Sequence, residues 1–174
     1  MMYRYTYPSA LGNLVLAADD TALCGAWFEG QKYFDGQLLQ GARPRADLPV
    51  FADCRAWLNR YFAGVSPGPV PPVRLSGSPF RQRVWNLLRH IPYGRLQTYG
   101  SLAAALAREA GGRLPAAQAV GGAVGHNPVS VFVPCHRVVG ARGQLTGYAG
   151  GIDVKRRLLA LEGIAFTADG RAVI

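Results

Sequence analysis

Lysine is nearly missing from this chain: Lys32 and Lys155 are the only two, and charged residues make up 17% of its 174 positions. No apolar run reaches the ~18–20 residues of a membrane span, and no secretory apolar stretch follows Met1. Three cysteines cannot all pair, and their spacing is not that of a disulfide framework. These absences exclude a disulfide-rich secreted scaffold, so we expect a cytoplasmic protein with no membrane partner.

The composition is that of a folded chain. Hydrophobic residues make up 49% of it, and a chain of this size buries ~70% of its unfolded surface. That suffices for a core without disulfides or a structural metal. The length allows one domain or two small ones.

Positive charge is concentrated in one half. Residues 1–77 carry 7 basic and 6 acidic side chains, whereas residues 78–174 carry 12 and 4, a net charge of +8 (12 − 4). Such an asymmetry suggests a polyanionic partner, most often nucleic acid. The alternative is a soluble surface from a genome that favours arginine.

The first half is predicted to be a small sheet covered by one helix. Residues 3–7, 13–18 and 22–28 are typical of strands, and residues 30–47 of a loop. Residues 50–62 show helical spacing, which predicts an α+β unit. Four prolines between residues 64 and 72 then predict a stiff, extended connector. We therefore expect an N-terminal α/β domain, 1–76, and a C-terminal domain, 77–174.

The C-terminal half is predicted to be mainly helical, with helices over residues 78–91, 98–108, 115–124 and about 153–162. Two short helices across a glycine turn, after a packing helix, are typical of a helix-turn-helix, although other small helical domains share this spacing. The third helix is nearly bare, because six of its positions are alanine or glycine. Such a helix permits close approach by a neighbouring helix or by a nucleic-acid backbone. The nearby basic residues Arg108 and Arg113 favour the nucleic-acid backbone.

The stretch that carries candidate chemistry follows an apolar run. Residues 129–133 are rich in β-branched side chains, which predicts a buried strand ended by Pro134. Cys135, His136 and Arg137 come next. An unperturbed thiol is only a few per cent thiolate at neutral pH, and an adjacent imidazole and guanidinium favour the thiolate. Cys135 therefore has the features of a nucleophile, whereas Cys24 and Cys54 are interpreted as structural.

A nucleophile and a base need further geometry. Adjacent residues of an extended chain point to opposite faces, so a turn after Pro134 or a bridging water must join Cys135 to His136. Glu162 is our candidate for orienting the imidazole, since a carboxylate in the last turn of a helix opposes the helix dipole. A solvated Glu at the helix end is the alternative. The Cys and His spacing is not that of a zinc site, and we expect no metal.

Several motifs of this chain occur together in one protein family. The segment Pro134–Val138 and residues 77–85 resemble, in turn, the active-site signature of the O6-alkylguanine-DNA alkyltransferases and the helix that opens their C-terminal domain. Further motifs fall in order at the family's spacing: Ile91–Gly94, Thr98–Tyr99, Ala119–Ala123, Asn127–Pro128, Gly147–Tyr148 and Leu161–Gly163. The match spans about residues 77–163, and the N-terminal meander is similar in style only.

The resemblance implies a fold and a function. The fold would be α/β (α+β): an RNase H-like sheet with a covering helix, followed by a winged-helix or helix-turn-helix domain that carries the nucleophile. The function would be direct-reversal DNA repair as a single-turnover methylated-DNA–protein-cysteine methyltransferase. A monomer without a cofactor would enter the minor groove of double-stranded DNA with its helix-turn-helix. It would flip an O6-alkylguanine out of the duplex into a pocket beside Cys135 and transfer the alkyl group to that thiol. O4-alkylthymine would be an additional candidate substrate.

The resemblance also implies site residues. His136 would deprotonate Cys135 through a water, Glu162 would hold His136, Asn127 would support the turn, and Tyr99 would supply a proton to the leaving guanine. The base would be contacted by Pro134, Val138 and Tyr148. The DNA would be contacted by Arg113, Gln118, Ala119, Gly122 and Arg137.

Two departures from the family concern DNA. Family members usually carry Arg immediately before the Ala-Val-Gly of the third helix, where this chain has Gln118. Residues 108–117 are also several positions longer than expected, which predicts an enlarged turn between the two helices.

Other functions remain open at this point. A non-catalytic relative that only binds lesions would carry Trp in place of Cys135. A winged-helix regulator would not need the Cys135-His136 pair, and a cysteine hydrolase usually has its Cys and His far apart in sequence.

Overall fold

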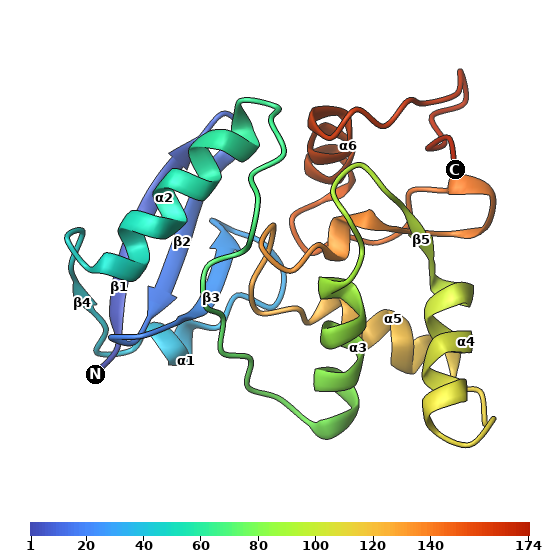
Figure 1. Cartoon of the computed structure of the whole chain (residues 1–174), viewed down its shortest axis with the longest axis horizontal. Helices are drawn as coiled ribbons and strands as arrows, with labels where there is room; N and C mark the ends of the chain where they lie inside the picture. Colours follow the sequence, from blue (N-terminus) through green and yellow to red (C-terminus); the bar gives the residue numbers. More distant parts are fainter. The chain divides into compact units, whose positions relative to one another are not determined.

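Three strands follow one another from the N-terminus, as the sequence predicts. The computed structural model describes residues 1–174, with β1 (Tyr3–Ser9), β2 (Gly12–Ala18) and β3 (Leu23–Phe28) forming an antiparallel meander (Figure 1). The two-residue β4 (Arg43–Pro44) adds to β1 in parallel, so the strand order is β3-β2-β1-β4.

One helix covers the sheet, which confirms the predicted α+β unit. α2 (Pro49–Phe62) starts at a proline and crosses β1 and β2 (Figure 1). Its Phe51 ring lies 5.8 Å from the ring of Tyr5. The Tyr7 hydroxyl donates to Oδ1 of Asn59 at 2.8 Å. The apolar spacing read from residues 50–62 is therefore the spacing of the buried face.

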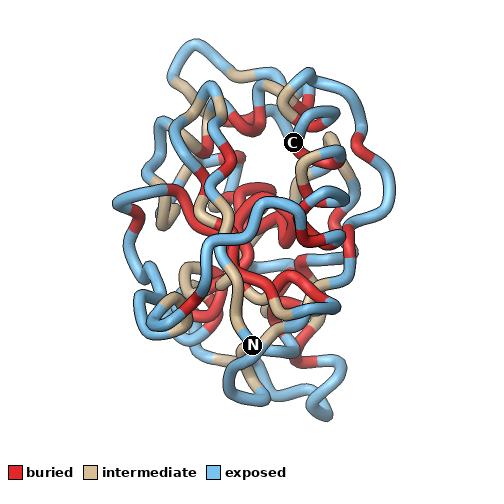
Figure 2. Tube along the Cα trace, turned by 90° about the vertical axis from the view of Figure 1, so that its left-hand side faces the viewer, coloured by how far each residue is buried: buried red, intermediate tan, exposed pale blue.

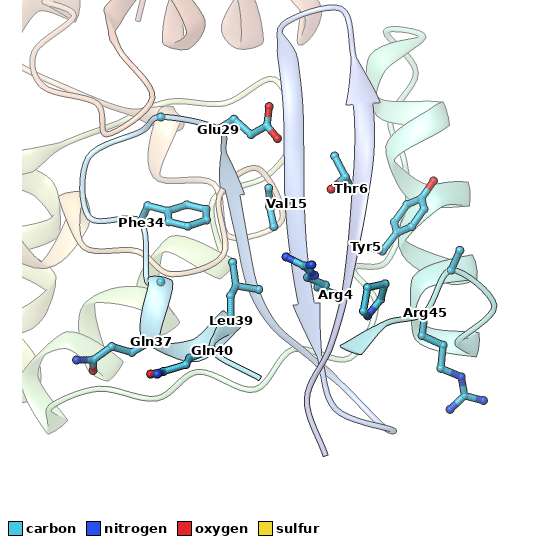
Figure 3. A pocket seen from close by; sticks show the side chains of 14 residues that line it. Arg4, Tyr5, Thr6, Val15, Glu29, Phe34, Gln37, Leu39, Gln40 and Arg45 are labelled. Carbon is cyan, nitrogen blue, oxygen red and sulfur yellow. The ribbon is translucent and has the colours of Figure 1, made fainter. Parts of the chain in front are cut away.

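The segment expected to be a loop contains one short helix, α1 (Gly36–Leu39), which the Asp35 carboxylate caps. An open cleft lies between α1, β1 and β2, and its lining includes Arg4, Val15 and Phe34 (Figure 3). Its lining holds no cysteine or histidine. The cleft therefore offers no thiol and no imidazole.

The second unit is built from four helices: α3 (Pro79–Arg89), α4 (Tyr99–Glu109), α5 (Ala117–Gly125) and α6 (Ile152–Leu161). The Ser78 hydroxyl caps α3, as predicted, and Thr98 and Ser101 form a capping box on α4. Indole Nε1 of Trp85 donates to the carbonyl of Ala123 at 2.8 Å, which ties α3 to α5. α3, α4 and α5 pack against one another, as a helix-turn-helix requires.

Two very short strands complete this unit. β5 (Gln97–Thr98) and β6 (Val138–Val139) pair in parallel. The 3-10 turns η1 (Cys135–Arg137) and η2 (Ala141–Gly143) flank β6. β5 leads directly into α4 and η1 directly into β6. Tyr99, the first residue of α4, is near enough to Cys135 for the two groups to interact electrostatically.

The chain folds into two compact units: the first is Met1–Ser76 with Pro128–Phe132, and the second is Gly77–Asn127 with Val133–Ile174. The predicted strand over residues 129–133 is wrong. Within this segment only Val129 forms a β-bridge, which pairs it with Ala26. The chain then turns, and Val131 adopts a φ of 72°. All five residues are buried, so their apolar composition reflects burial and not strand pairing.

Each unit has its own core. Figure 2 marks the buried positions along the chain. The first core includes Leu14, Leu16, Phe51 and Leu58, and the second includes Val84, Leu88, Leu102 and Leu158. None of the helices combines the length and the apolar character needed to cross a membrane.

Candidate active site

Cys135 begins the 3-10 turn directly after Pro134, which provides the turn that the sequence argument required. Its side chain is nearly buried, with the residue 5% exposed. The Nδ2 group of Asn127 donates to Sγ of Cys135 at 3.1 Å and to the carbonyl of Val133 at 2.7 Å. Asn127 therefore holds both the thiol and the backbone that leads into it.

The environment of the thiol acts in two directions. Burial raises the pKa of Cys135 above its ordinary value, while the hydrogen bond from Asn127 and the charge of Lys155 oppose that rise. The resting group is therefore a neutral thiol. It needs a base when it reacts.

His136 and Glu162 form the buried pair that the sequence suggested. Nε2 of His136 lies 2.6 Å from Oε1 of Glu162, and both side chains have no exposed surface. Glu162 is the C-cap of α6 and is not solvated. With Nε2–H donating to the carboxylate, Nδ1 of the neutral imidazole is the ring's acceptor nitrogen.

The two pKa values of this pair follow from burial and charge. Burial lowers the pKa of His136, and Glu162 only partly offsets that effect. Burial alone would raise the pKa of Glu162, but the contacts with His136 and Arg137 outweigh it and hold that pKa below its ordinary range. The pair is thus a neutral imidazole beside an ionised carboxylate at neutral pH.

Arg137 lies in the interior and not on the surface where the resemblance led us to expect it. Its Nε and Nη2 donate to the two oxygens of Glu162 at 2.8 and 3.1 Å, and Nη1 donates to the carbonyl of Ile91 at 2.6 Å. The residue is 7% exposed. Its donors serve protein acceptors, so it is not available to DNA in this structure.

Lys155 is a buried charge that the sequence reasoning missed. It has no exposed surface, and Nζ donates to the carbonyls of Val138 and Thr146 at 2.5 and 3.2 Å. Burial lowers its pKa to about 8. A signal was present, because Lys155 shares the buried face of α6 with Leu158 and Leu159 at positions i, i+3 and i+4.

The predicted proton donor and the predicted base-contacting residues differ in how far they are buried. Tyr99 opens α4, its hydroxyl donates to the carbonyl of Thr146 at 3.3 Å, and burial raises its pKa. Pro134 and Val138 are buried, and the Val138 carbonyl already accepts from Lys155. Tyr148 is half-buried on the loop before α6.

The DNA-contact candidates other than Arg137 lie on the surface. Gln118, Ala119 and Gly122 are exposed on α5, and Arg113 is exposed in the turn before it. α5 buries its other face through Val120, Ala123 and Val124. A Cβ added at Gly121 or Gly122 would meet no atom within 4 Å, so packing within the chain does not require these glycines.

Both halves of the chain match sequence models of one protein family. Residues 2–67 match the ribonuclease-like domain of 6-O-methylguanine DNA methyltransferase, and residues 79–164 match its DNA-binding domain. The chain belongs to this family. The ribonuclease-like domain is the sheet with α2, and the DNA-binding domain contains Cys135, His136 and Glu162.

Relatives of the 6-O-methylguanine DNA methyltransferase family match along nearly the whole chain. The methylated-DNA–protein-cysteine methyltransferase of Haemophilus influenzae is 38% identical over 170 residues, 97% of this chain and 90% of that protein. The protein of the same name from Mycolicibacterium paratuberculosis is 44% identical over 160 residues, 92% of this chain and 91% of that protein.

Solved structures match in fold as well. The crystal structure of the O6-methylguanine methyltransferase of Mycobacterium tuberculosis has a TM-score of 0.77 and 41% identity, covering 93% of each chain. Mycobacterium tuberculosis OGT in complex with DNA has a TM-score of 0.74 and 39% identity, covering 92% of this chain and 91% of that one. These matches confirm the predicted fold class.

Proposed function

We propose that this chain is a methylated-DNA–protein-cysteine methyltransferase that reverses alkylation damage directly and acts once. It would move the alkyl group from O6 of guanine in double-stranded DNA to Sγ of Cys135, with O4-alkylthymine as a further candidate substrate. The observation that carries the proposal is the nearly buried Cys135 thiol followed by the buried His136–Glu162 pair, in a chain of this family.

The reaction is a displacement at the alkyl carbon. Sγ of Cys135 forms a bond to that carbon while the bond between carbon and O6 breaks, and the electron pair leaves with O6. The thiol proton passes to His136, directly or through a water, and a proton is supplied to the guanine as it leaves. The product thioether is a poor leaving group, so the thiol is not regenerated.

Further residues are assigned from their positions. Tyr99 is the proposed proton donor to the guanine, because it opens α4 near enough to Cys135 for the two groups to interact electrostatically. Asn127 supports the Cys135 turn through its two hydrogen bonds. Pro134, Val138 and Tyr148 are proposed to contact the flipped base.

DNA would meet the exposed face of α5. The open positions of Gly121 and Gly122 allow a groove to approach the backbone closely. Gln118 and Ala119 share that helix, and Arg113 lies in the turn before it. We propose that a monomer enters the minor groove with this face and that the lesion is flipped out of the duplex.

A non-catalytic lesion-binding protein is the alternative from the same family, and Cys135 itself argues against it. The test is stoichiometry. Wild type and Cys135→Ser are each incubated with an excess of duplex that contains O6-methylguanine, and restored guanine is counted. One guanine per wild-type chain and none for Cys135→Ser supports the proposal. Continued turnover, or no restored guanine in either sample, refutes it.

A further inference from the structure

Arg137 is the residue of the Pro134–Val138 segment whose side chain the proposed reaction leaves without a task. Its guanidinium donates from Nε and Nη2 to both oxygens of Glu162 and from Nη1 to the carbonyl of Ile91. A bidentate fork of this kind combines geometric specificity with strong, charge-assisted bonds.

We propose that Arg137 is a positioning residue for alkyl transfer: its guanidinium fixes Glu162 against His136 and neutralises that carboxylate, so that His136 stands as a neutral base. The inference rests on the proposed function, because it assigns how the base of that reaction is prepared.

The contacts of Glu162 show how the position is fixed. Oε1 accepts from Nε2 of His136 and from Nη2 of Arg137, while Oε2 accepts from Nε of Arg137 and from the amide of Gly94 at 3.0 Å. These four donors match the roughly four acceptor sites of a carboxylate. The carboxylate cannot turn without breaking the fork, so the imidazole that it holds is oriented as well.

The same contacts tie the turn after α3 to the end of α6. The carbonyl of Ile91 and the amide of Gly94 both belong to this turn, and the Tyr93 hydroxyl donates to the carbonyl of Leu161 at 3.0 Å. Gly94 has a φ of 70°, and a Cβ there would lie 3.1 Å from the carbonyl oxygen of Glu162. Only glycine allows this close approach without strain.

Burial lowers the pKa of His136 most, and the charge of Arg137 adds to that effect. A buried carboxylate beside an imidazole favours the imidazolium, since an opposite charge stabilises the charged form. Arg137 supplies one positive charge against the one negative charge of Glu162, and this removes most of that pull. The other titratable groups that face this network are Cys135, Lys155, Tyr93 and Tyr99. None of them donates a fork to Glu162.

The experiment compares single-turnover rates of alkyl transfer against pH for wild type, Arg137→Met and Arg137→Lys. Free O6-alkylguanine is the substrate, so that DNA binding does not enter. Arg137→Met removes the charge, and we expect the acid limb of its profile to move up by about one pH unit. Arg137→Lys keeps the charge but not the fork, so its acid limb should stay while its plateau rate falls about tenfold.

Arg156→Lys is the matched control. Arg156 lies on α6, is half-buried and donates from Nη2 to the carbonyl of Gly170 at 3.3 Å, outside the site. This variant should keep the wild-type profile. The inference is overturned if Arg137→Met loses the same factor at every pH, as a merely structural residue would. If Arg137→Met does not fold, a wild-type plateau in Arg137→Lys overturns it. A wild-type chain that transfers no alkyl group overturns the proposed function first.

Discussion

The amide of Asn127 donates to Sγ of Cys135 at 3.1 Å and to the carbonyl of Val133 at 2.7 Å, so one side chain links the nucleophile to the turn that carries it. The bond to sulfur lowers the pKa of the thiol against the effect of burial. We expect Asn127→Ala to slow alkyl transfer at neutral pH by about tenfold. It should also lower the free energy of unfolding by about 1–3 kcal/mol, because a buried carbonyl loses its partner.

Asn59→Ala is the control for that variant. Asn59 accepts a hydrogen bond from Tyr7 in the first unit, so its loss should lower stability without slowing transfer. Rates at several pH values and urea unfolding measure both effects. Equal transfer rates in the two variants would show that Asn127 acts only on stability.

Lys155 should set the reactivity of the thiol through its charge. Its positive charge lowers the pKa of Cys135, so Lys155→Met should raise that pKa and move the thiol's reaction with iodoacetamide to higher pH, by about one unit. Lys32, the other lysine of the chain, is exposed in the first unit, and Lys32→Met is the matched control. Coinciding profiles for the two variants would contradict this electrostatic role.

Acid should destabilise the protein through the His136–Glu162 pair. Burial lowers the folded pKa of His136 below its ordinary 6.5, so the unfolded chain binds a proton there first and stability falls as pH drops below 6.5. The folded pKa of Glu162 lies below its ordinary 4.5, so its contribution is present above 4.5 and is lost as pH falls through the folded pKa.

This acid effect can be assigned by substitution. Just below pH 6.5 the free energy of unfolding of wild type should fall with decreasing pH. His136→Gln should reduce the slope of that fall, by at most about 1.4 kcal/mol per pH unit. His90 is exposed on the surface, and His90→Gln is the control for loss of a histidine outside this pair. Urea unfolding at a series of pH values decides, and an unchanged slope in His136→Gln would contradict the assignment.

Gln118 should limit how readily the lesion is flipped. It can fill space in a duplex, but it brings no positive charge into the minor groove. We expect Gln118→Arg to speed repair of alkylated duplex more than repair of free O6-alkylguanine, and a change of ~1 kcal/mol would alter the flipped population about fivefold. If Arg113 already supplies the charge, Gln118→Arg changes little and Arg113→Ala weakens duplex binding sharply. If neither substitution alters the repair of duplex DNA, the residue that contacts the groove lies elsewhere on the protein.

The elements that the sequence predicted are those with enough residues to show a period. β1 to β3, α2, α3, α4 and α6 were predicted within a few residues, because each repeats its apolar positions over two or more turns or alternations. β5, β6 and α1 are two to four residues long and have no period to detect. Residues 129–133 were misread because burial and strand pairing select the same side chains.

The residues of the site also fall into two groups: those that the sequence identified and those that only tertiary packing could place. Cys135, His136 and Glu162 were identified from local context together with the family's motif, and the structure places His136 and Glu162 in direct contact. Arg137 was misplaced, since a position next to a nucleophile does not say whether a side chain faces DNA or the protein. Lys155 was overlooked because a single lysine on a helix is ordinarily solvated, and only tertiary packing shows that three carbonyls surround it.

The most direct test is the mass of the intact protein after incubation with a duplex containing one O6-methylguanine, followed by peptide mapping. Cys24 and Cys54 serve as internal controls, since both belong to the first unit whereas His136 and Glu162 belong to the second. The account predicts that each chain gains a single methyl group and that it lies on Cys135. An unchanged mass, or a methyl group on Cys24 or Cys54, would contradict it.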